Sequence, residues 1–460
     1  MMNSAVTEIM LGGMYTAIFL SLFSLGEFIR RKFPRNPECS RKTVHFLGGI
    51  AAMSFPYVLS SHWTVLVLTA GFCLVIAVTK HLGVLESVHG VGRHSSGAVY
   101  YPLAVYLIFF LARGHPVLYL TSILVMTVSD TCAALAGGRY GAVKYDAEGN
   151  FKSLEGSVVF FFLTFLCVHL PLLLMTDISR IDSVLIAVIL AVLVTGFEAI
   201  SLSGSDNLIV PFGTFFILMK MTRLPHAGVM ESLYYLLGAV VITWVLSARL
   251  HLFRLSGLVA MMLLNYAALS LCNVFWFFPL VLAQTCYYVL MKIFAHYEGA
   301  EQIRRYQVRV IFYLGLMPAI ILFAANMADN PLVWYLPYVT AISVQVAIVG
   351  RYFISRYVSR MIGAEGFFQR HRWVLSIVCA LTATFWVAGF PVAVYVPARA
   401  WHSFAVVLFG TWAAYAFHFI VWRAVEGAQN EQYEYPRRFI SAALGVACVM
   451  AAQCAILTYT

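Results

Sequence analysis

The feature that most constrains this chain is a series of about sixteen apolar runs, most of them long enough to cross a bilayer. Hydrophobic residues make up 62% of the 460 residues and charged residues only 11%, whereas a soluble domain is about 25% charged. So few charges would not cover a water-facing surface, which excludes a soluble or disordered protein. The sequence therefore predicts an all-α polytopic integral membrane protein with about 14–16 transmembrane helices.

The basic residues predict the orientation of the chain. The net charge is +10, and Arg and Lys concentrate in every second loop if the N-terminus lies outside. The positive-inside rule then places the loops at about 30–42, 80–96, 137–155 and 201–206 on one cytoplasmic face. A basic excess can also indicate nucleic-acid binding, but this one lies in short loops between apolar runs. We therefore expect the bilayer, and no nucleic acid, as a partner.

Several classes of site are not indicated. The nine cysteines are scattered without CxxC spacing, so neither a zinc site nor a disulfide framework is expected. The chain has no GxxxxGK[ST], GxSxG or HExxH motif. It is therefore not expected to be a phosphate-loop NTPase, a hydrolase with a nucleophile elbow or a metalloprotease of the HExxH type.

Four polar segments do not resemble plain connectors. The first is Arg41-Lys42-Thr43-Val44-His45, in which Arg41 and His45 are four residues apart and share one face of a helix. By itself this segment is equally explained as a basic anchor at the head-group level. The second, residues 93–102, precedes an apolar run and could bind phosphate or simply end a loop.

The third segment extends from Asp130 to Gly141 and continues through Lys152-Ser-Leu-Glu155-Gly156. Asp130 lies inside an otherwise apolar helix, where a carboxylate is costly and is a functional candidate by default. The other candidates are glycines that can present N–H groups to an anion, bases that can meet phosphate, and an acid that can share Mg²⁺; they are Gly137, Gly141, Gly156, Arg139, Lys152 and Glu155. The simpler alternative is a small-residue packing helix followed by a solvated loop.

The fourth segment begins at Glu198 and leads through a Ser/Gly loop to Asp206-Asn207. The acids could hold a metal, or Asp206 could simply cap a helix. Pro211 and Gly213 follow, and they predict a broken span over 207–222.

All four segments fall on the same predicted face. Acids that could hold Mg²⁺ would lie beside bases that could hold phosphates, which are the ingredients of phosphoryl or nucleotidyl transfer. The acids are Asp130, Glu155, Glu198 and Asp206, and the bases are Arg41, His45, Arg139 and Lys152.

Residues 40–225 or so resemble the dolichol kinase and phytol kinase family of CTP-using integral-membrane polyprenol kinases. Three motifs carry the resemblance, in family order: RKxxH at 41–45, the run from Asp130 through Ser157, and Glu198 through Pro211. The second segment is less similar, because Ala98 stands where the family often has an acidic residue. Residues 251–460 match no family, so we expect a catalytic transmembrane domain over 1–250 and an additional helical domain of unknown function over 251–460.

The resemblance implies a CTP-dependent kinase that transfers the γ-phosphoryl group to an isoprenoid alcohol of the dolichol, polyprenol or phytol type, at the cytoplasmic face. The implied catalytic residues are Asp130, Lys152, Glu155, Asp206 and His45. Cofactor-binding residues would be Arg41, Gly137, Arg139, Gly141, Lys152, Gly156 and Asn207. Mg²⁺ would be held by Asp130, Glu155 and Asp206.

Two alternatives stay open at this point. A CTP:phosphatidate cytidylyltransferase, which makes CDP-diacylglycerol, is also a many-helix enzyme using CTP and Mg²⁺. Its closing motif ends in Asp-Arg-x-Asp, where this chain has Ser-Gly-Ser-Asp-Asn-Leu. A lipid transporter or flippase would suit the many spans, but paired broken helices are expected there and only 207–222 has this pattern.

Overall fold

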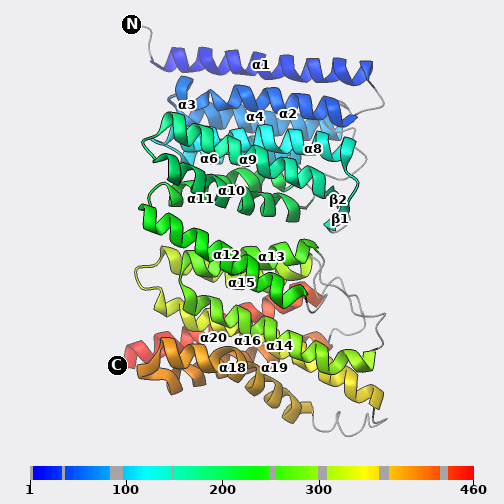
Figure 1. Ribbon diagram of the computed structural model, residues 1–460, viewed down its shortest axis with the longest axis vertical. Coiled ribbons are helices and arrows are strands. Elements are labelled where there is room, and N and C mark those ends of the chain that lie inside the picture. Colours follow the sequence, from blue (N-terminus) through cyan, green and yellow to red (C-terminus); the bar gives the residue numbers. More distant parts are fainter. Residues whose placement is uncertain are drawn as a thin grey trace. The chain divides into compact units, whose positions relative to one another are not determined.

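The computed structural model describes residues 4–33, 37–82, 97–147, 150–202, 204–248, 255–298, 308–361, 372–424 and 434–459. These residues form helices joined by short connections, together with one small antiparallel hairpin (Figure 1). In the described part of the chain, nine helices are long and apolar enough to cross a membrane, and five shorter apolar helices accompany them. The predicted all-α polytopic membrane architecture is confirmed.

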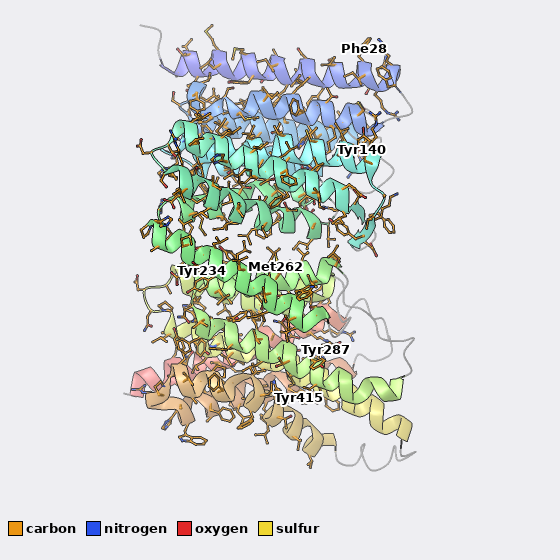
Figure 2. The ribbon with its side chains drawn as sticks, in the orientation of Figure 1. Phe28, Tyr140, Tyr234, Met262, Tyr287 and Tyr415 are labelled. Carbon is orange, nitrogen blue, oxygen red and sulfur yellow. The ribbon has the colours of Figure 1, made fainter. Side chains whose placement is uncertain are left out.

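The outward-facing side chains fit a lipid environment. Phe28 and Tyr234 are each 62% exposed, and they point away from their helices (Figure 2). Contiguous exposed apolar surface is rare on soluble monomers, but it is the surface that hydrocarbon requires. Buried residues such as Tyr119 and Tyr415, each 1% exposed, form the interior contacts between helices.

The chain divides into two compact units, Met1–Tyr234 and Tyr235–Thr460. The division falls inside helix α12, whereas the sequence predicts a boundary at about residue 250. The bounds in the first unit are α1 Ser4–Lys32, α2 Pro37–Met53, α3 Phe55–Val58, α4 His62–His81, α6 Gly97–Leu111, α7 Pro116–Leu124, a π-helical turn Val125–Ser129, α8 Asp130–Tyr140, β1 Lys144–Ala147, β2 Asn150–Ser153, α9 Leu154–Met175, α10 Arg180–Ile200, α11 Asp206–Met221 and α12 His226–Ala248.

The second unit is helical wherever it is described. Its bounds are α13 Leu255–Leu271, α14 Val274–Glu298, α15 Val308–Met327, α16 Leu332–Met361, α18 Arg372–Tyr395, a 3₁₀ turn Pro397–Arg399, α19 Ala400–Ala424 and α20 Glu434–Tyr459. Helix α16 packs against α14, α15, α18, α19 and α20.

One continuous span in the first unit carries the polar centre. Helix α7, the π-helical turn and α8 run from Pro116 to Tyr140 without a break, and the turn ends immediately before Asp130. Helix α9 packs against both α8 and α10, and α2 packs against α7 and α8. A π-helical turn widens the helix locally and frequently marks a functional site. No pattern in the sequence predicts it.

The expected break over 207–222 is wrong, because α11 is one helix from Asp206 to Met221 with Pro211 inside it. Pro211 lies beyond the first four N–H groups of the helix, so it removes one helical hydrogen bond, but the helix continues past it to Met221. Gly213 serves packing, since a Cβ there would come within 2.6 Å of the Phe197 ring of α10. Gly213 therefore permits a close contact between α10 and α11, and neither residue breaks the helix.

Candidate functional site

A polar cavity of about 370 Å³ lies in the first unit, at the end of the helix bundle that carries the hairpin. Its walls are the start of α2, the length of α8, the hairpin, the first turn of α9, the end of α10 and the start of α11. Acidic and basic side chains of the wall are Glu38, Arg41, Lys42, Asp130, Lys144, Lys152, Glu198 and Asp206. The first, third and fourth polar segments of the sequence therefore meet at one place.

The second segment is described only from Gly97 onward, and Arg93–Ser96 lie outside the described residues. The Gly97 carbonyl accepts a hydrogen bond from Asn207 Nδ2 at 2.9 Å. A Cβ on Gly97 would come within 2.6 Å of that nitrogen. This glycine therefore lets α6 approach the loop before α11 closely, and Asn207 joins the two.

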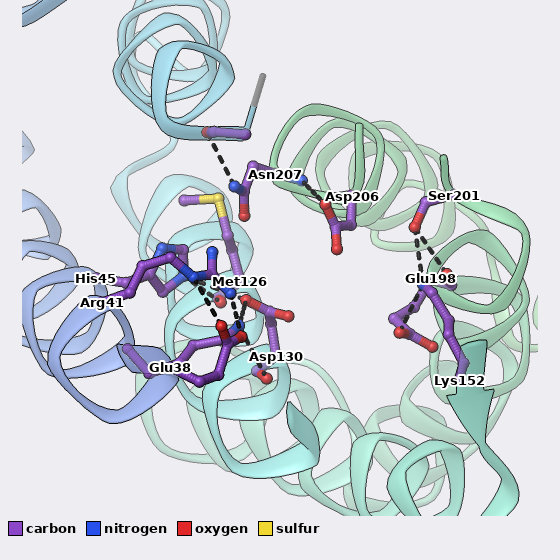
Figure 3. A network of polar contacts seen from close by, with 12 residues as sticks. Glu38, Arg41, His45, Met126, Asp130, Lys152, Glu198, Ser201, Asp206 and Asn207 are labelled. Atoms are coloured by element: carbon purple, nitrogen blue, oxygen red, sulfur yellow. Dashed lines mark hydrogen bonds and ion pairs between the residues drawn. The ribbon is translucent and has the colours of Figure 1, made fainter. Parts of the chain in front are cut away.

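A buried ion pair forms one side of the cavity (Figure 3). Lys42 Nζ lies 2.6 Å from Asp130 Oδ2, and the two side chains are 5% and 12% exposed. His45 Nε2 lies 3.4 Å from the same oxygen and 3.1 Å from the carbonyl of Met126 in the π-helical turn. Asp130 is thus held from α2 by two side chains, about one helical turn apart.

Arg41 extends the same wall. Its guanidinium donates to both carboxylate oxygens of Glu38, one turn earlier in α2. Glu38 lies in the first turn of that helix, where a negative charge is favoured by the helix dipole. The pair fixes the guanidinium at the cavity instead of leaving it free at the surface.

A second ion pair forms the opposite side (Figure 3). Lys152, the penultimate residue of β2, donates to Glu198 Oε1 at 2.8 Å, to Ser201 Oγ at 2.9 Å and to the Glu198 carbonyl. All three protons of its ammonium group therefore have an acceptor. Burial alone would lower the pKa of Lys152, but the charges of Glu198 and Asp206 outweigh it and raise the pKa. The ammonium therefore stays charged.

Asp206 stands between the two pairs at the start of α11. Its Oδ1 accepts from the adjacent backbone N–H of Asn207 at 3.1 Å, and its carboxylate points into the space between Asp130 and Lys152 (Figure 3). Among the described residues it is the carboxylate of the cavity without an ion pair, and Lys144 is the corresponding cation. These two charges are the ones available to a ligand without breaking an existing pair.

The glycines of the third segment bring backbones together at the cavity floor. A Cβ on Gly141 would collide with the Gly137 carbonyl, and one on Gly156 would lie 3.1 Å from the Ala133 carbonyl. The N–H groups of Gly141 and Gly156 are already used, by the Gly137 carbonyl and by Ser153 Oγ respectively. Close packing of α8 against α9 is therefore their observed role, while all three glycines still line the cavity.

Substitution of two nearby glycines should have opposite effects. Gly141→Ala forces a Cβ against backbone and should destabilise the protein by about 1–3 kcal/mol. Gly138→Ala is the matched control: a Cβ there would have no neighbouring atom within 4 Å, and alanine favours a helix interior by about 1 kcal/mol. Thermal unfolding of both variants in one detergent measures the difference. An unchanged melting temperature for Gly141→Ala would contradict the packing role.

Most of the predicted site residues lie at this cavity. Those that line it are Arg41, Asp130, Gly137, Gly141, Lys152, Gly156, Asp206 and Asn207. His45 does not line the cavity, but its Nε2 lies 3.4 Å from Asp130 Oδ2. Two residues lie elsewhere: the exposed Arg139 places its guanidinium over the Tyr140 ring at 5.4 Å, and Glu155 accepts from the backbone N–H of Val143 at 3.1 Å.

Several members of the site are not among the residues that the sequence predicts for it. Lys42 belongs to the first motif, and its position three residues before His45, on the same helix face, is the signal that could have included it. Glu198 stands among the acids of the predicted face that could hold Mg²⁺, but it is not among the residues predicted for the site. Ser201 lies inside the third motif without an assigned role, whereas Glu38 and Lys144 carry no signal that distinguishes them from ordinary loop and helix-end residues.

The residues present fit a magnesium ion that arrives with a phosphate ligand. Within the described residues, no three His, Cys, Asp or Glu side chains come close enough to hold a metal alone. Mg²⁺ commonly takes only one or two carboxylates and completes its shell with phosphate and water. Asp206 forms no ion pair with another described residue and faces the cavity beside Asp130, which meets that requirement. Glu155 is turned to the hairpin and does not join them.

Comparison with known proteins agrees with the geometry. The chain is similar to a phytol kinase of Synechocystis sp., with 33% identity over 191 residues, which is 41% of this chain and 81% of that relative. No protein-family model matches the chain, and no solved structure matches it.

Proposed function

The chain belongs to the phytol kinase family, and from this premise we propose that it is a CTP-dependent kinase of an isoprenoid alcohol. The reaction would transfer the γ-phosphoryl group of CTP to the alcohol oxygen. A bond forms between that oxygen and the γ-phosphorus, the bond from the γ-phosphorus to its bridging oxygen breaks, and CDP leaves. The hydroxyl proton is released, and the product is an isoprenyl phosphate.

The observation that carries this proposal is the arrangement of charges in the polar cavity, in which ion pairs on two sides flank the unpaired Asp206 and Lys144 among the described residues. Phosphoryl transfer depends on positioning and charge stabilisation more than on covalent chemistry. Lys144, Lys152 and Arg41 would neutralise the phosphates, and Lys152 is already fixed by three acceptors. Asp206 and Asp130 would hold Mg²⁺, which when bound supplies further neutralisation of phosphate charge.

The position of the cavity supports a lipid acceptor. It lies where α8, α10 and α11 end or begin, and α8 and α10 belong to spans that are long and apolar enough to cross a bilayer. A soluble nucleotide and the hydroxyl end of a membrane lipid can meet at such a boundary. A purely soluble acceptor would not require the catalytic carboxylates to lie at the ends of spanning helices.

We expect the cavity to face the cytoplasm. On a background without native cysteines, Lys144→Cys should not react with a membrane-impermeant maleimide added to intact cells. Arg113→Cys is the matched control, because it lies at the other end of the Pro116–Tyr140 span and should react readily. Reaction at position 144 with equal efficiency would reverse the proposed orientation.

The proposed function is tested by a panel of donors and acceptors. Purified protein in nanodiscs would receive CTP, ATP, GTP or UTP with Mg²⁺, together with phytol, geranylgeraniol or a long polyprenol. The expected result is a monophosphate of at least one alcohol, formed fastest with CTP and lost when Mg²⁺ is chelated. Formation of CDP-diacylglycerol from phosphatidate would identify a cytidylyltransferase instead.

A further inference from the structure

The second unit contains a cavity of its own, of about 120 Å³. Its walls come from α13, α14, α15 and α16, and nearly all of the lining side chains are apolar, including Leu264 and Ile342. Two glutamines interrupt this lining: Gln284 on α14 and Gln345 on α16. They are 9% and 7% exposed, so both amides are withdrawn from solvent.

The orientation of the Gln284 amide is fixed by its partners. Its Nε2 donates to the Leu280 carbonyl at 3.2 Å and to Asn265 Oδ1 at 3.1 Å. Because the Leu280 carbonyl can only accept, the atom beside it must be the nitrogen. Asn265 is in turn held by Thr243, whose hydroxyl oxygen accepts from Asn265 Nδ2 at 2.9 Å. Gln284 Oε1 is the other polar atom of this amide, and among the described residues it has no hydrogen-bond partner.

Gln345 repeats this arrangement on the neighbouring helix. Its Nε2 donates to the carbonyl of Arg438 at 3.3 Å, which again identifies the nitrogen. Its Oε1 is buried and has no partner in the part of the chain that the structure describes. An amide oxygen in apolar surroundings is costly unless it receives a hydrogen bond, and such groups are rare in native proteins. Two amide oxygens at one apolar cavity, Gln284 Oε1 and Gln345 Oε1, therefore each lack a hydrogen-bond donor among the described residues.

We propose that this cavity binds the hydroxyl end of a long-chain isoprenoid alcohol, with the hydroxyl donating to Gln284 or Gln345. The apolar lining and the two acceptors define a ligand with a hydrocarbon body and a single donor. An apolar cavity of about 150 Å³ holds a benzene molecule, so this one takes about one five-carbon unit, and the rest of the chain extends into the bilayer. The lining of the cavity and its two acceptors indicate an apolar alcohol as the ligand. That this alcohol is an isoprenoid rests on the proposed function.

The site would hold the alcohol without reacting with it. The lining of this cavity contains no Asp, Glu, Lys or Arg side chain among the described residues, so it lacks groups that neutralise phosphate. It is a binding site separate from the polar cavity of the first unit. This gives the second unit a role as a reservoir for the acceptor of the reaction.

Photolabelling of the full chain tests this inference. The protein in nanodiscs, without nucleotide, would be exposed to a diazirine analogue of geranylgeraniol, and the labelled peptides identified by mass spectrometry. Labels should fall in α13–α16, which line the cavity, and be displaced by geranylgeraniol. Its methyl ether, which has the same chain but no donor, should compete about tenfold more weakly, as expected for the loss of one hydrogen bond. Equal competition by the ether, or absence of saturable labelling, would overturn the proposal and leave a cavity filled by water or an acyl chain.

Variants of the two glutamines give a second test. The double variant Gln284→Leu/Gln345→Leu should weaken displacement about tenfold, because it removes both acceptors that the hydroxyl can use. Gln453→Leu is the matched control, because Gln453 Oε1 is also buried without a partner among the described residues, but Gln453 does not line the cavity. If the double variant fails to fold, the comparison with the methyl ether still decides, since it leaves the protein unchanged. Because no nucleotide is present, failure of the kinase proposal would not affect either result.

Discussion

Replacing Asp206 with asparagine should lower turnover at least about 100-fold while leaving the folded protein nearly as stable as the parent. Loss of one charge-stabilising group typically raises a barrier by about 2.7–4 kcal/mol. Asp206 is suited to this test because its only hydrogen bond among the described residues comes from the adjacent Asn207 N–H, so no buried cation loses its partner. Initial rates at saturating nucleotide and alcohol, with a melting curve for each protein, measure the two quantities.

The matched control is Asp177→Asn, which removes an exposed carboxylate from the connection between α9 and α10. The hairpin and the polar cavity lie at the other end of α9. We expect both the turnover and the melting temperature of this variant to equal those of the parent. If Asp206→Asn also retained the parental turnover, Asp206 would be only an acidic residue in the first turn of α11, after the N-cap Ser205.

Replacing Lys42 with methionine should both destabilise the protein and abolish activity. Removing one partner of a buried ion pair leaves an uncompensated charge and costs about 3–5 kcal/mol. Lys42 and Asp130 meet this description, with their charged atoms 2.6 Å apart and side chains 5% and 12% exposed. Denaturant unfolding in a fixed detergent, followed by tryptophan fluorescence, reports the loss.

The double variant Lys42→Met/Asp130→Asn separates structure from chemistry. Removing both charges of a buried pair is often close to neutral for stability, so most of the lost stability should return. Turnover should not return, because the double variant still lacks the Asp130 carboxylate at the cavity. A double variant as active as the parent would show that the pair only holds α2 against α8.

The sequence is sufficient to predict the architecture and the set of elements that build the site. Apolar runs define the spans, because hydrocarbon requires every backbone group to be satisfied within a helix. An intramembrane acid such as Asp130 can be recognised as a functional candidate, because a charged side chain in the bilayer has a high free-energy cost. Pro211 gives a misleading signal for α11, because a proline inside a membrane helix removes a backbone hydrogen bond without ending the helix, which here continues to Met221.

The pairing of charges could not be predicted from the sequence. Lys42 and Asp130 are 88 residues apart in the chain, and which lysine meets which acid is set by how α2 packs against α8. Glu155 is expected at the metal, but it begins α9 beside the hairpin, and the Val143 N–H holds it there. The glycines of the third segment illustrate the same limit, since a small residue permits approach of a ligand or of a neighbouring helix equally well.

The γ-phosphoryl group of CTP, and not its cytidylyl group, should move to the lipid. CTP labelled with ³²P at the γ-position and ³H in the cytosine ring tests this in one measurement, with the isoprenoid alcohol and phosphatidate both present. We expect ³²P in the lipid phase without ³H, and loss of this signal in Asp206→Asn. Recovery of ³H in the lipid phase without ³²P would contradict the assignment as a kinase.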